Sequence, residues 1–165
     1  MGVGFAVAEA MLAAKYNKPE FTVIDHYTYG LTSDGDLMEG VASEAASLAG
    51  TLGLGKLIYL YDDNKITIEG STDIAFTEDV EARFKAYGWQ VLRVADSEDI
   101  EAMEAAVKEA QADTEHPSLI IVRTHIGYGS PKQDSASCHG EPLGAEALAL
   151  TKEKAGWPVG QPFYV

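Results

Sequence analysis

Short apolar runs alternate along the chain with longer segments whose apolar positions recur at helical spacing. The short runs predict four strands, at residues 28–32, 56–61, 90–94 and 119–122. The longer segments predict four helices, at residues 2–16, 38–52, 77–87 and 97–112. Because strand and helix alternate, we expect an α/β fold: a doubly wound parallel sheet with helices on both faces.

The predicted helices carry signals of where they begin and which side they bury. In the fourth helix, Ile100, Met103 and Val107 lie on one stripe behind an acidic start. Thr77 is a suitable N-cap for the third helix, because its hydroxyl can accept a backbone N–H. The alanines of the first helix suit close packing against a neighbour.

Composition and charge exclude several classes of protein. The chain has 165 residues, 46% of them hydrophobic and 23% charged, which suits one globular domain with a single core. The net charge of −14 repels phosphate backbones, so nucleic-acid binding is a poor hypothesis. No apolar run is long enough to predict a membrane span.

Cysteine usage and the start of the chain bear on its compartment. Cys138 is the only cysteine, so no internal disulfide can form and nothing indicates an oxidising environment. No charged and apolar leader of an export signal opens the chain, so we expect a cytoplasmic protein. Cys138 adjoins His139, but neighbours in sequence rarely face each other, and a passive thiol is favoured over a nucleophile.

Polar residues that follow the predicted strands form the candidate site. In a parallel sheet, ligands bind beyond the carboxyl ends of the strands, which places Asp34, Asn64 and the loop 124–140 at one edge. Gly35 lets backbone approach an anion while the Asp34 carboxylate holds a hard cation. Asn64 adds a neutral amide oxygen, and the pair suits octahedral Mg²⁺. An ordinary solvated turn is the alternative at both positions.

Longer strings around these residues are more specific. They are Ser33-Asp34-Gly35-Asp36-Leu37-Met38-Glu39-Gly40 with its continuation to Ala45, Tyr61-Asp62-Asp63-Asn64-Lys65-Ile66, Gly70-Ser71-Thr72-Asp73, Asp25-His26-Tyr27-Thr28-Tyr29, Gly127-Tyr128-Gly129-Ser130-Pro131 and His139-Gly140-Glu141-Pro142-Leu143. In order along the chain, these strings closely resemble transketolase. The Asp-Gly pair with its later Asn resembles the thiamine-diphosphate signature that many enzymes share.

The resemblance implies a cofactor site for thiamine diphosphate and Mg²⁺ (or Ca²⁺). In that family, the residues that match Asp34 and Asn64 hold the metal, as does the backbone carbonyl at the position of Ile66. The residues that match Gly35 and Asn64 contact the diphosphate. Ser33 stands where many family members have glycine, but the Asp and the following Gly of the signature remain.

Three further residues acquire roles near the cofactor through the same resemblance. Ile68 and Ile126 match apolar residues that flank the thiazolium ring, where a low-dielectric pocket favours the neutral form of the ring. For both, a plain core isoleucine is the alternative. His139 matches a catalytic histidine near the cofactor and the substrate hydroxyl groups, a task for an imidazole that donates or accepts near neutral pH.

Two acids match family residues at the subunit interface, between the two active sites. They are Glu39 and Glu44. Buried like charges share protons, so one of the pair is expected to titrate high. For Glu39, a simple acid at a helix N-terminus is the alternative.

The resemblance also implies an activity and the parts that complete it. The activity is transfer of a two-carbon ketol unit between sugar phosphates. Residues 1–160 correspond to the diphosphate-binding domain, incomplete at its N-terminus, and residues 161–165 to the start of a linker. The carboxylate that activates the aminopyrimidine belongs to a second, pyrimidine-binding domain of the family. We therefore expect a homodimer or a complementary transketolase chain as partner, and no activity from this chain alone.

Two other functions are compatible with the same signature. One is a subunit of another thiamine-diphosphate enzyme, such as a deoxyxylulose-phosphate synthase or a 2-oxo-acid dehydrogenase. The other is a non-catalytic module that binds the cofactor or dimerises without turnover. The strings at residues 61–64 and 127–130 favour transketolase over the first.

Overall fold

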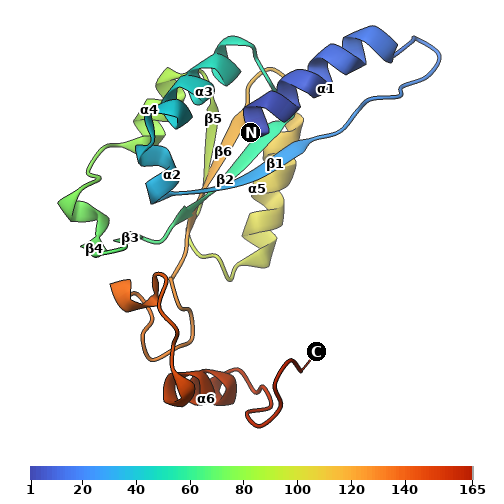
Figure 1. Ribbon diagram of the computed structural model, residues 1–165. Coiled ribbons are helices and arrows are strands. Elements are labelled where there is room, and N and C mark those ends of the chain that lie inside the picture. Colours follow the sequence, from blue (N-terminus) through green and yellow to red (C-terminus); the bar gives the residue numbers. More distant parts are fainter. Residues whose placement is uncertain (165) are drawn as a thin grey trace. The chain divides into compact units, whose positions relative to one another are not determined.

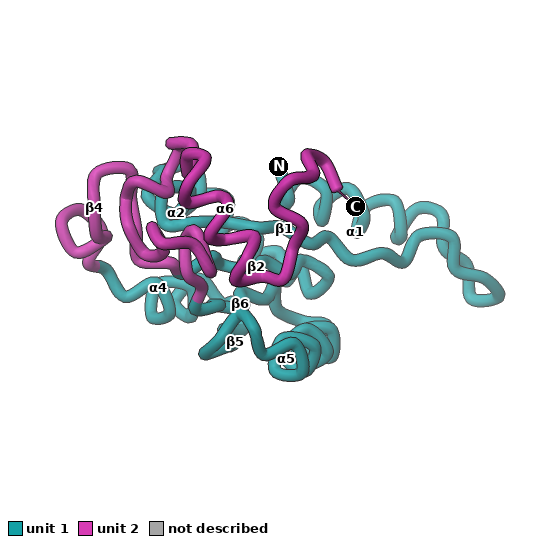
Figure 2. Tube along the Cα trace, turned by 90° about the horizontal axis from the view of Figure 1, so that it is seen from below, with its two compact units in different colours: residues 1–63, 78–123 teal, residues 64–77, 124–165 magenta. Residues whose placement is uncertain are grey.

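The computed structural model describes residues 1–164 (Figure 1). These residues form two compact units (Figure 2). The first unit holds residues 1–63 and 78–123, and the second holds residues 64–77 and the chain from residue 124 on. The chain thus enters the second unit twice, each time directly after a strand of the first.

Four parallel strands form the sheet of the first unit, in the order β1-β2-β6-β5. They are β1 (Thr28–Ser33), β2 (Leu57–Asp63), β5 (Gln90–Val94) and β6 (Ser118–Arg123). The four predicted strands are confirmed, with ends that differ by one or two residues. All three pairings are parallel, so the carboxyl ends of the strands lie at the same edge of the sheet.

Helices cover both faces of this sheet, as predicted (Figure 1). On one face, Ala106 and Ala110 pack against Ile58 and Ile120 in a cluster of buried apolar side chains. These alanines belong to α5 (Ile100–Ala112); the opposite face carries α1 (Gly2–Tyr16), α3 (Gly40–Thr51) and α4 (Val80–Ala86). Within the described residues, no helix combines the length and the apolar character needed to cross a membrane.

Aromatic side chains fill the face opposite α5. The rings of Phe84 and Trp89 meet edge to face with centroids 5.1 Å apart, a geometry that adds about 1 kcal/mol to burial alone. Tyr59 follows Ile58 in β2, points to this other face, and has its ring centroid 6.3 Å from that of Trp89. The indole N–H of Trp89 donates to the carbonyl oxygen of Ala46 at 2.8 Å, which fastens α3 to the sheet.

The predicted helix 38–52 is wrong in its extent, because the segment forms two helices. The first is α2 (Asp34–Met38), which begins directly after β1. Glu39 then takes an extended conformation, with φ −71° and ψ 131°, and α3 begins at Gly40. The cause lies before the predicted start: a capping box at Ser33 and Asp36 starts a helical turn earlier than the apolar pattern shows.

The starts of two other helices also differ from the prediction. Thr77 does not cap α4; the Asp79 carboxylate accepts the backbone N–H of Ala82 at 2.9 Å instead. In α5, the cap is Asp99, whose carboxylate accepts the N–H of Ala102 at 2.9 Å. Both helices therefore begin about one turn later than predicted, at the last acid of an acidic run rather than at its first polar residue.

The second unit contains elements that the sequence did not predict. They are the antiparallel pair β3 (Ile66–Thr67) and β4 (Gly70–Ser71), two short 3₁₀ turns at Thr72–Ile74 and Ala136–Cys138, and helix α6 (Ala145–Lys154). After α6, the rings of Trp157 and Tyr164 meet edge to face with centroids 5.5 Å apart. Trp157 keeps 47% of its surface exposed.

A glycine-to-alanine pair tests how closely α3 packs. A Cβ added at Gly50 would lie 1.7 Å from the carbonyl oxygen of Tyr87, at the end of α4. Gly50→Ala is therefore expected to lower the free energy of unfolding by about 3 kcal/mol or more, because backbone must move. Chemical denaturation followed by circular dichroism measures the change.

Gly4→Ala is the matched control, since Gly4 is also helical but has nothing within 4 Å of an added Cβ. It should raise the free energy of unfolding by up to about 1 kcal/mol through helix propensity. Equal effects from the two substitutions would contradict the close approach of α3 and α4.

Candidate functional site

The turn between β1 and α2 fixes the first part of the candidate site. The backbone N–H and the hydroxyl of Ser33 both donate to Asp36 Oδ2, at 2.9 and 3.0 Å. These two hydrogen bonds make the chain turn directly from strand to helix. They also fix the backbone conformation of Asp34 and Gly35, which lie between the bonded residues. Asp34, the first residue of α2, is buried, with 3% of its surface exposed.

Tyr61 holds the Asp34 carboxylate from the neighbouring strand. Its hydroxyl donates to Asp34 Oδ1, and only 2% of the tyrosine is exposed. Burial raises the pKa of Tyr61, and the hydrogen bond to Asp34 and the negative charges of Asp34 and Asp63 raise it further. The phenol therefore stays protonated and remains a donor throughout the pH range of a working enzyme.

Gly35 leaves its surroundings open. A Cβ added there would meet only Ser33 Oγ, at 4.0 Å. The backbone at this position is therefore accessible to a ligand, since no side chain shields it.

Asn64 is the first residue of the second unit and directly follows the last residue of β2. Its side-chain Oδ1 accepts the backbone N–H of Ile66 at 2.8 Å, and 8% of the residue is exposed. Between them, Lys65 has φ 65°, in the left-handed region that non-glycine residues rarely occupy. The carbonyl oxygen of Lys65 accepts the N–H of Thr72 at 3.0 Å, so the short hairpin behind it holds this tight turn.

The structure separates the two predicted isoleucines. Ile68 lies at the tip of the β3–β4 hairpin, and 66% of its surface is exposed. It is therefore not a core isoleucine within the described part of the chain. Ile126 is half-buried, and its carbonyl oxygen accepts the N–H of Asp134 at 2.9 Å. That bond closes the glycine-rich loop on itself.

His139 lies at the far end of the same loop, directly after a 3₁₀ turn. It is exposed, and its backbone N–H donates to the carbonyl oxygen of Ala136 at 2.9 Å. Earlier in the loop, His125 Nδ1 lies 2.9 Å from a carboxylate oxygen of Asp134. Asp134 has φ 59°, another left-handed non-glycine residue. His139 is thus solvent-facing on a loop whose shape is fixed by other residues.

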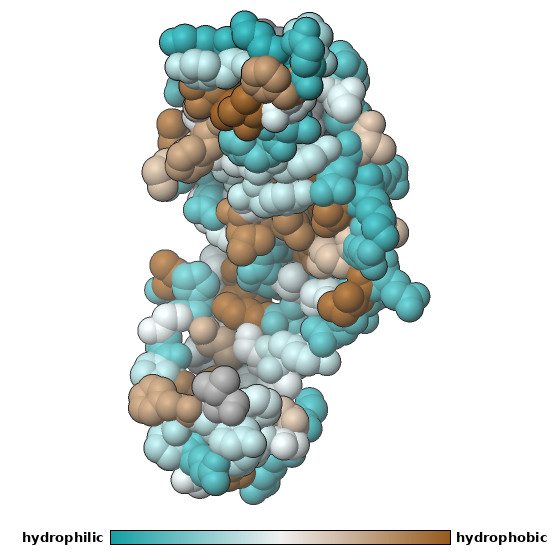
Figure 3. Space-filling model, turned by 90° about the vertical axis from the view of Figure 1, so that its right-hand side faces the viewer, coloured by the Kyte–Doolittle hydropathy of each residue, from teal (hydrophilic) through white to brown (hydrophobic). Residues whose placement is uncertain are grey.

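The two acids predicted for the interface lie at α3. Glu39 is the N-cap residue of that helix but makes no side-chain capping bond, and Glu44 lies one turn further on. Both side chains are exposed. Large apolar side chains of the same helix are also exposed, notably Val41 at 68% and Leu48 at 50%. Hydrophobic areas, drawn in brown, also reach the surface on the face shown in Figure 3.

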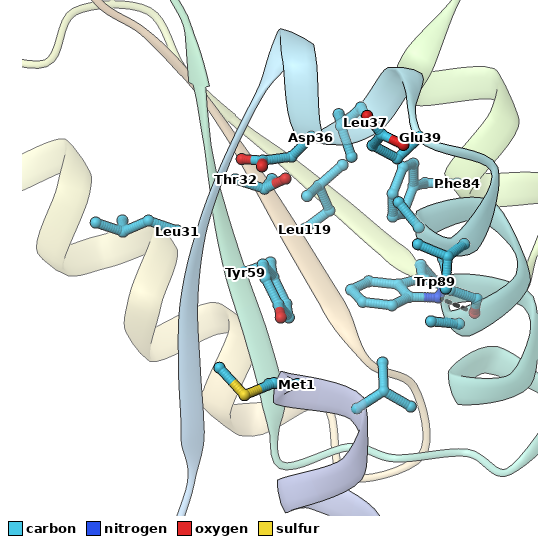
Figure 4. A pocket seen from close by; sticks show the side chains of 15 residues that line it. Met1, Leu31, Thr32, Asp36, Leu37, Glu39, Tyr59, Phe84, Trp89 and Leu119 are labelled. Carbon is cyan, nitrogen blue, oxygen red and sulfur yellow. Dashed lines mark hydrogen bonds between the residues drawn. The ribbon is translucent and has the colours of Figure 1, made fainter.

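A cavity in the first unit was not predicted from the sequence. Its volume is about 330 Å³, and it lies between the sheet, the start of α1 and the helices α2 and α3 (Figure 4). Its lining is mainly apolar and includes Leu31, Leu37, Ala42, Tyr59, Phe84 and Leu119. The run of alanines in α3 was the available signal, because small side chains leave space against a sheet.

Comparisons with known proteins agree with this geometry. The family model "Transketolase, thiamine diphosphate binding domain" matches residues 1–165. The chain belongs to this family. Among curated relatives, the transketolase of Nostoc sp. is 57% identical over 99% of this chain, and that of Geobacillus stearothermophilus is 55% identical over all of it. Each alignment covers only 25% of the relative, so the chain spans about a quarter of their length.

Solved structures give the same result for the fold. A transketolase from Pichia stipitis in complex with sedoheptulose-7-phosphate is 52% identical and has a TM-score of 0.98, over 99% of this chain and 24% of that one. The transketolase of Leishmania mexicana is 45% identical with a TM-score of 0.97, over 99% of this chain and 25% of that one. The parallel α/β fold is thus the thiamine-diphosphate-binding fold of transketolases.

The residues at the strand ends of this transketolase-family domain fit a divalent metal with a diphosphate. Asp34 carries a buried carboxylate and Asn64 a buried amide oxygen, and both are hard oxygen ligands of the kind that such a metal prefers. An amide oxygen has two lone-pair sites, so acceptance of the N–H of Ile66 is compatible with a second bond to the same oxygen. The described residues contain no group of three or more His, Cys, Asp or Glu arranged for a metal.

Alkaline pH should reveal the buried phenol. Because the folded state raises the pKa of Tyr61, the unfolded chain loses this proton near its ordinary value of about 10 while the folded chain keeps it. The contribution to stability is therefore present below pH about 10 and is lost as pH rises above it. Denaturation curves measured across this range should show a shallower decline for Tyr61→Phe than for the parent protein. Parallel declines would contradict the assignment.

Proposed function

We propose that this chain supplies the diphosphate- and metal-binding half of a transketolase active site. The activity is transfer of a two-carbon ketol unit between sugar phosphates. One observation carries the proposal: Asp34-Gly35 and Asn64 directly follow two adjacent strands paired in parallel register, in a chain of the thiamine-diphosphate-binding family. Such strand ends are where ligands bind in open α/β sheets.

The chain's own residues would hold the cofactor by its diphosphate. Asp34, Asn64 and the backbone carbonyl of Ile66 would bind Mg²⁺ or Ca²⁺, and the open backbone at Gly35 would contact phosphate oxygens. When bound, thiamine diphosphate supplies the carbanion chemistry, and the protein's task is to hold, orient and shield it. Rigid turns suit this task, since a loose ligand would misplace the reacting atom.

Side chains of the second unit would serve the reacting end. Ile68 and Ile126 would line the thiazolium ring, exclude water and lower the local dielectric. The exposed position of Ile68 supports a contact surface rather than a core role. The imidazole of His139, on its glycine- and serine-rich loop, would bind substrate hydroxyl groups and accept or donate a proton there.

Completion of the site requires more than this chain. The carboxylate that activates the aminopyrimidine would come from a pyrimidine-binding domain, in a homodimer or on a complementary chain. Glu39 and Glu44 would lie at that subunit interface, and the exposed apolar residues beside them support a covered surface.

The first test measures both turnover and metal binding in the complete protein. With thiamine diphosphate and Mg²⁺, it should convert xylulose 5-phosphate and ribose 5-phosphate. Asp34→Ala should weaken metal binding by at least about 100-fold, because a buried carboxylate ligand is lost. Isothermal titration with Mg²⁺ in the presence of the cofactor gives the affinity.

Asp73→Ala is the matched control, since Asp73 is an exposed acid of the same charge. It should bind metal as the parent does. Turnover of pyruvate in place of the sugar phosphates would indicate another thiamine enzyme. Cofactor binding without any turnover would indicate a non-catalytic module, and unchanged metal affinity in Asp34→Ala would contradict the site.

A second test separates chemistry from folding at His139. Since this side chain is exposed, His139→Ala should lower kcat by about 100-fold and leave the melting temperature within a degree or two. His116→Ala is the control, because His116 is also exposed and pairs with Asp113 in another loop. A stability loss in His139→Ala with normal turnover would show that the residue is structural.

A further inference from the structure

We propose that Tyr61 is a positioning residue for the metal site, whose hydroxyl holds the Asp34 carboxylate in the orientation that binds the metal. This inference rests on the proposed function and deepens it, because it assigns a role to a residue that is bonded to a proposed metal ligand. The resemblance to transketolase assigned Tyr61 no role. The hydrogen bond in the structure is what identifies it.

Strand register brings the two side chains together. Tyr61 of β2 is paired with Thr32 of β1, and Asp34 follows two residues later, where β1 turns into α2. The tyrosine ring can therefore reach along its neighbour strand to the carboxylate beyond its end. Both residues are almost fully buried, at 2% and 3% exposure, so water cannot readily replace the hydroxyl.

The bond restrains the torsions that matter for metal binding. The capping box at Ser33 and Asp36 already fixes the backbone of Asp34. A donor on Oδ1 then restricts rotation of the carboxylate about its last torsion. A carboxylate oxygen has two lone-pair sites, so acceptance of this bond leaves coordination to a cation available. Hydrogen-bond partners of metal ligands act in this way in many metalloproteins.

Tyr59 provides a comparison within the same strand. It lies two residues earlier and on the same face, but it lines the apolar cavity, and its hydroxyl donates to no carboxylate in the part of the chain that the structure describes. Tyr59→Phe removes one hydroxyl group from β2, just as Tyr61→Phe does. An effect specific to Tyr61 therefore arises from the acids that its hydroxyl faces, Asp34 and Asp63, and a double-mutant cycle with Asp34 separates the two.

The experiment measures metal affinity directly. Mn²⁺ is titrated into the complete protein with saturating thiamine diphosphate, and free Mn²⁺ is followed by electron paramagnetic resonance. Tyr61→Phe should bind Mn²⁺ about 10-fold more weakly than the parent. Tyr59→Phe should bind as the parent does. Parent-like affinity in Tyr61→Phe overturns the inference but leaves the proposed function intact, whereas failure of the parent protein to bind Mn²⁺ overturns both.

A double-mutant cycle separates positioning from general stabilisation. In an Asp34→Ala background, Tyr61→Phe should have no further effect on Mn²⁺ affinity, because the oxygen that accepts the Tyr61 hydrogen bond is gone. An equal loss in both backgrounds would mean that Tyr61 acts on the fold, and would overturn the inference.

A second substitution keeps the test valid if Tyr61→Phe does not fold. Replacement of Tyr61 by 4-aminophenylalanine retains a donor of the same size, but an aniline N–H donates more weakly than a phenol. The Mn²⁺ affinity should fall below that of the parent. Affinity equal to the parent's in a protein with the parent's melting temperature overturns the inference.

Discussion

The parallel pairing of β1 with β2 is the constraint on which the candidate site depends. Ser33 stands opposite Asp62, so the chain leaves both strands at the same edge and almost at the same level. Asp34 directly follows the last residue of β1, and Asn64 directly follows the last residue of β2. The two strand ends differ in level by one residue. A shift of this register by one residue would point Tyr61 to the opposite face of the sheet and remove its bond to Asp34.

Packing on both faces of the sheet holds that register. Alternate residues of β2 serve different layers: Ile58 faces α5, while Tyr59 and Tyr61 face the helices on the other side. Ile58, Leu57 and Ile120 have no exposed surface at all. Such a sandwiched strand cannot slide without exposing one apolar layer and burying polar groups. The packing of β2 on both faces therefore stabilises the fold and also fixes the geometry of the candidate site.

Much of this arrangement could be predicted from the sequence. The features that could not be predicted depend on backbone geometry or on contacts between distant segments. The strands and the positions of Asp34 and Asn64 followed from apolar runs that stop at polar residues. The starts of α4 and α5 did not, because Asp79 and Asp99 had competing polar neighbours and only backbone geometry decides which side chain caps the helix. The role of Tyr61 depends on contact across two strands, which no single segment reveals. The β3–β4 hairpin is held by Lys65 in a left-handed turn that apolar periodicity cannot signal.

The two tryptophans fall one in each compact unit. Trp89 is 5% exposed, packed against Phe84 and bonded to the carbonyl of Ala46, whereas Trp157 is largely exposed to water. Buried and hydrated indoles emit at different wavelengths, so the fluorescence spectrum of this chain has a blue component from the sheet and a red component from the C-terminal segment. The protein thus carries two intrinsic optical reporters, and loss of order in one unit can be followed separately from the other without any added label.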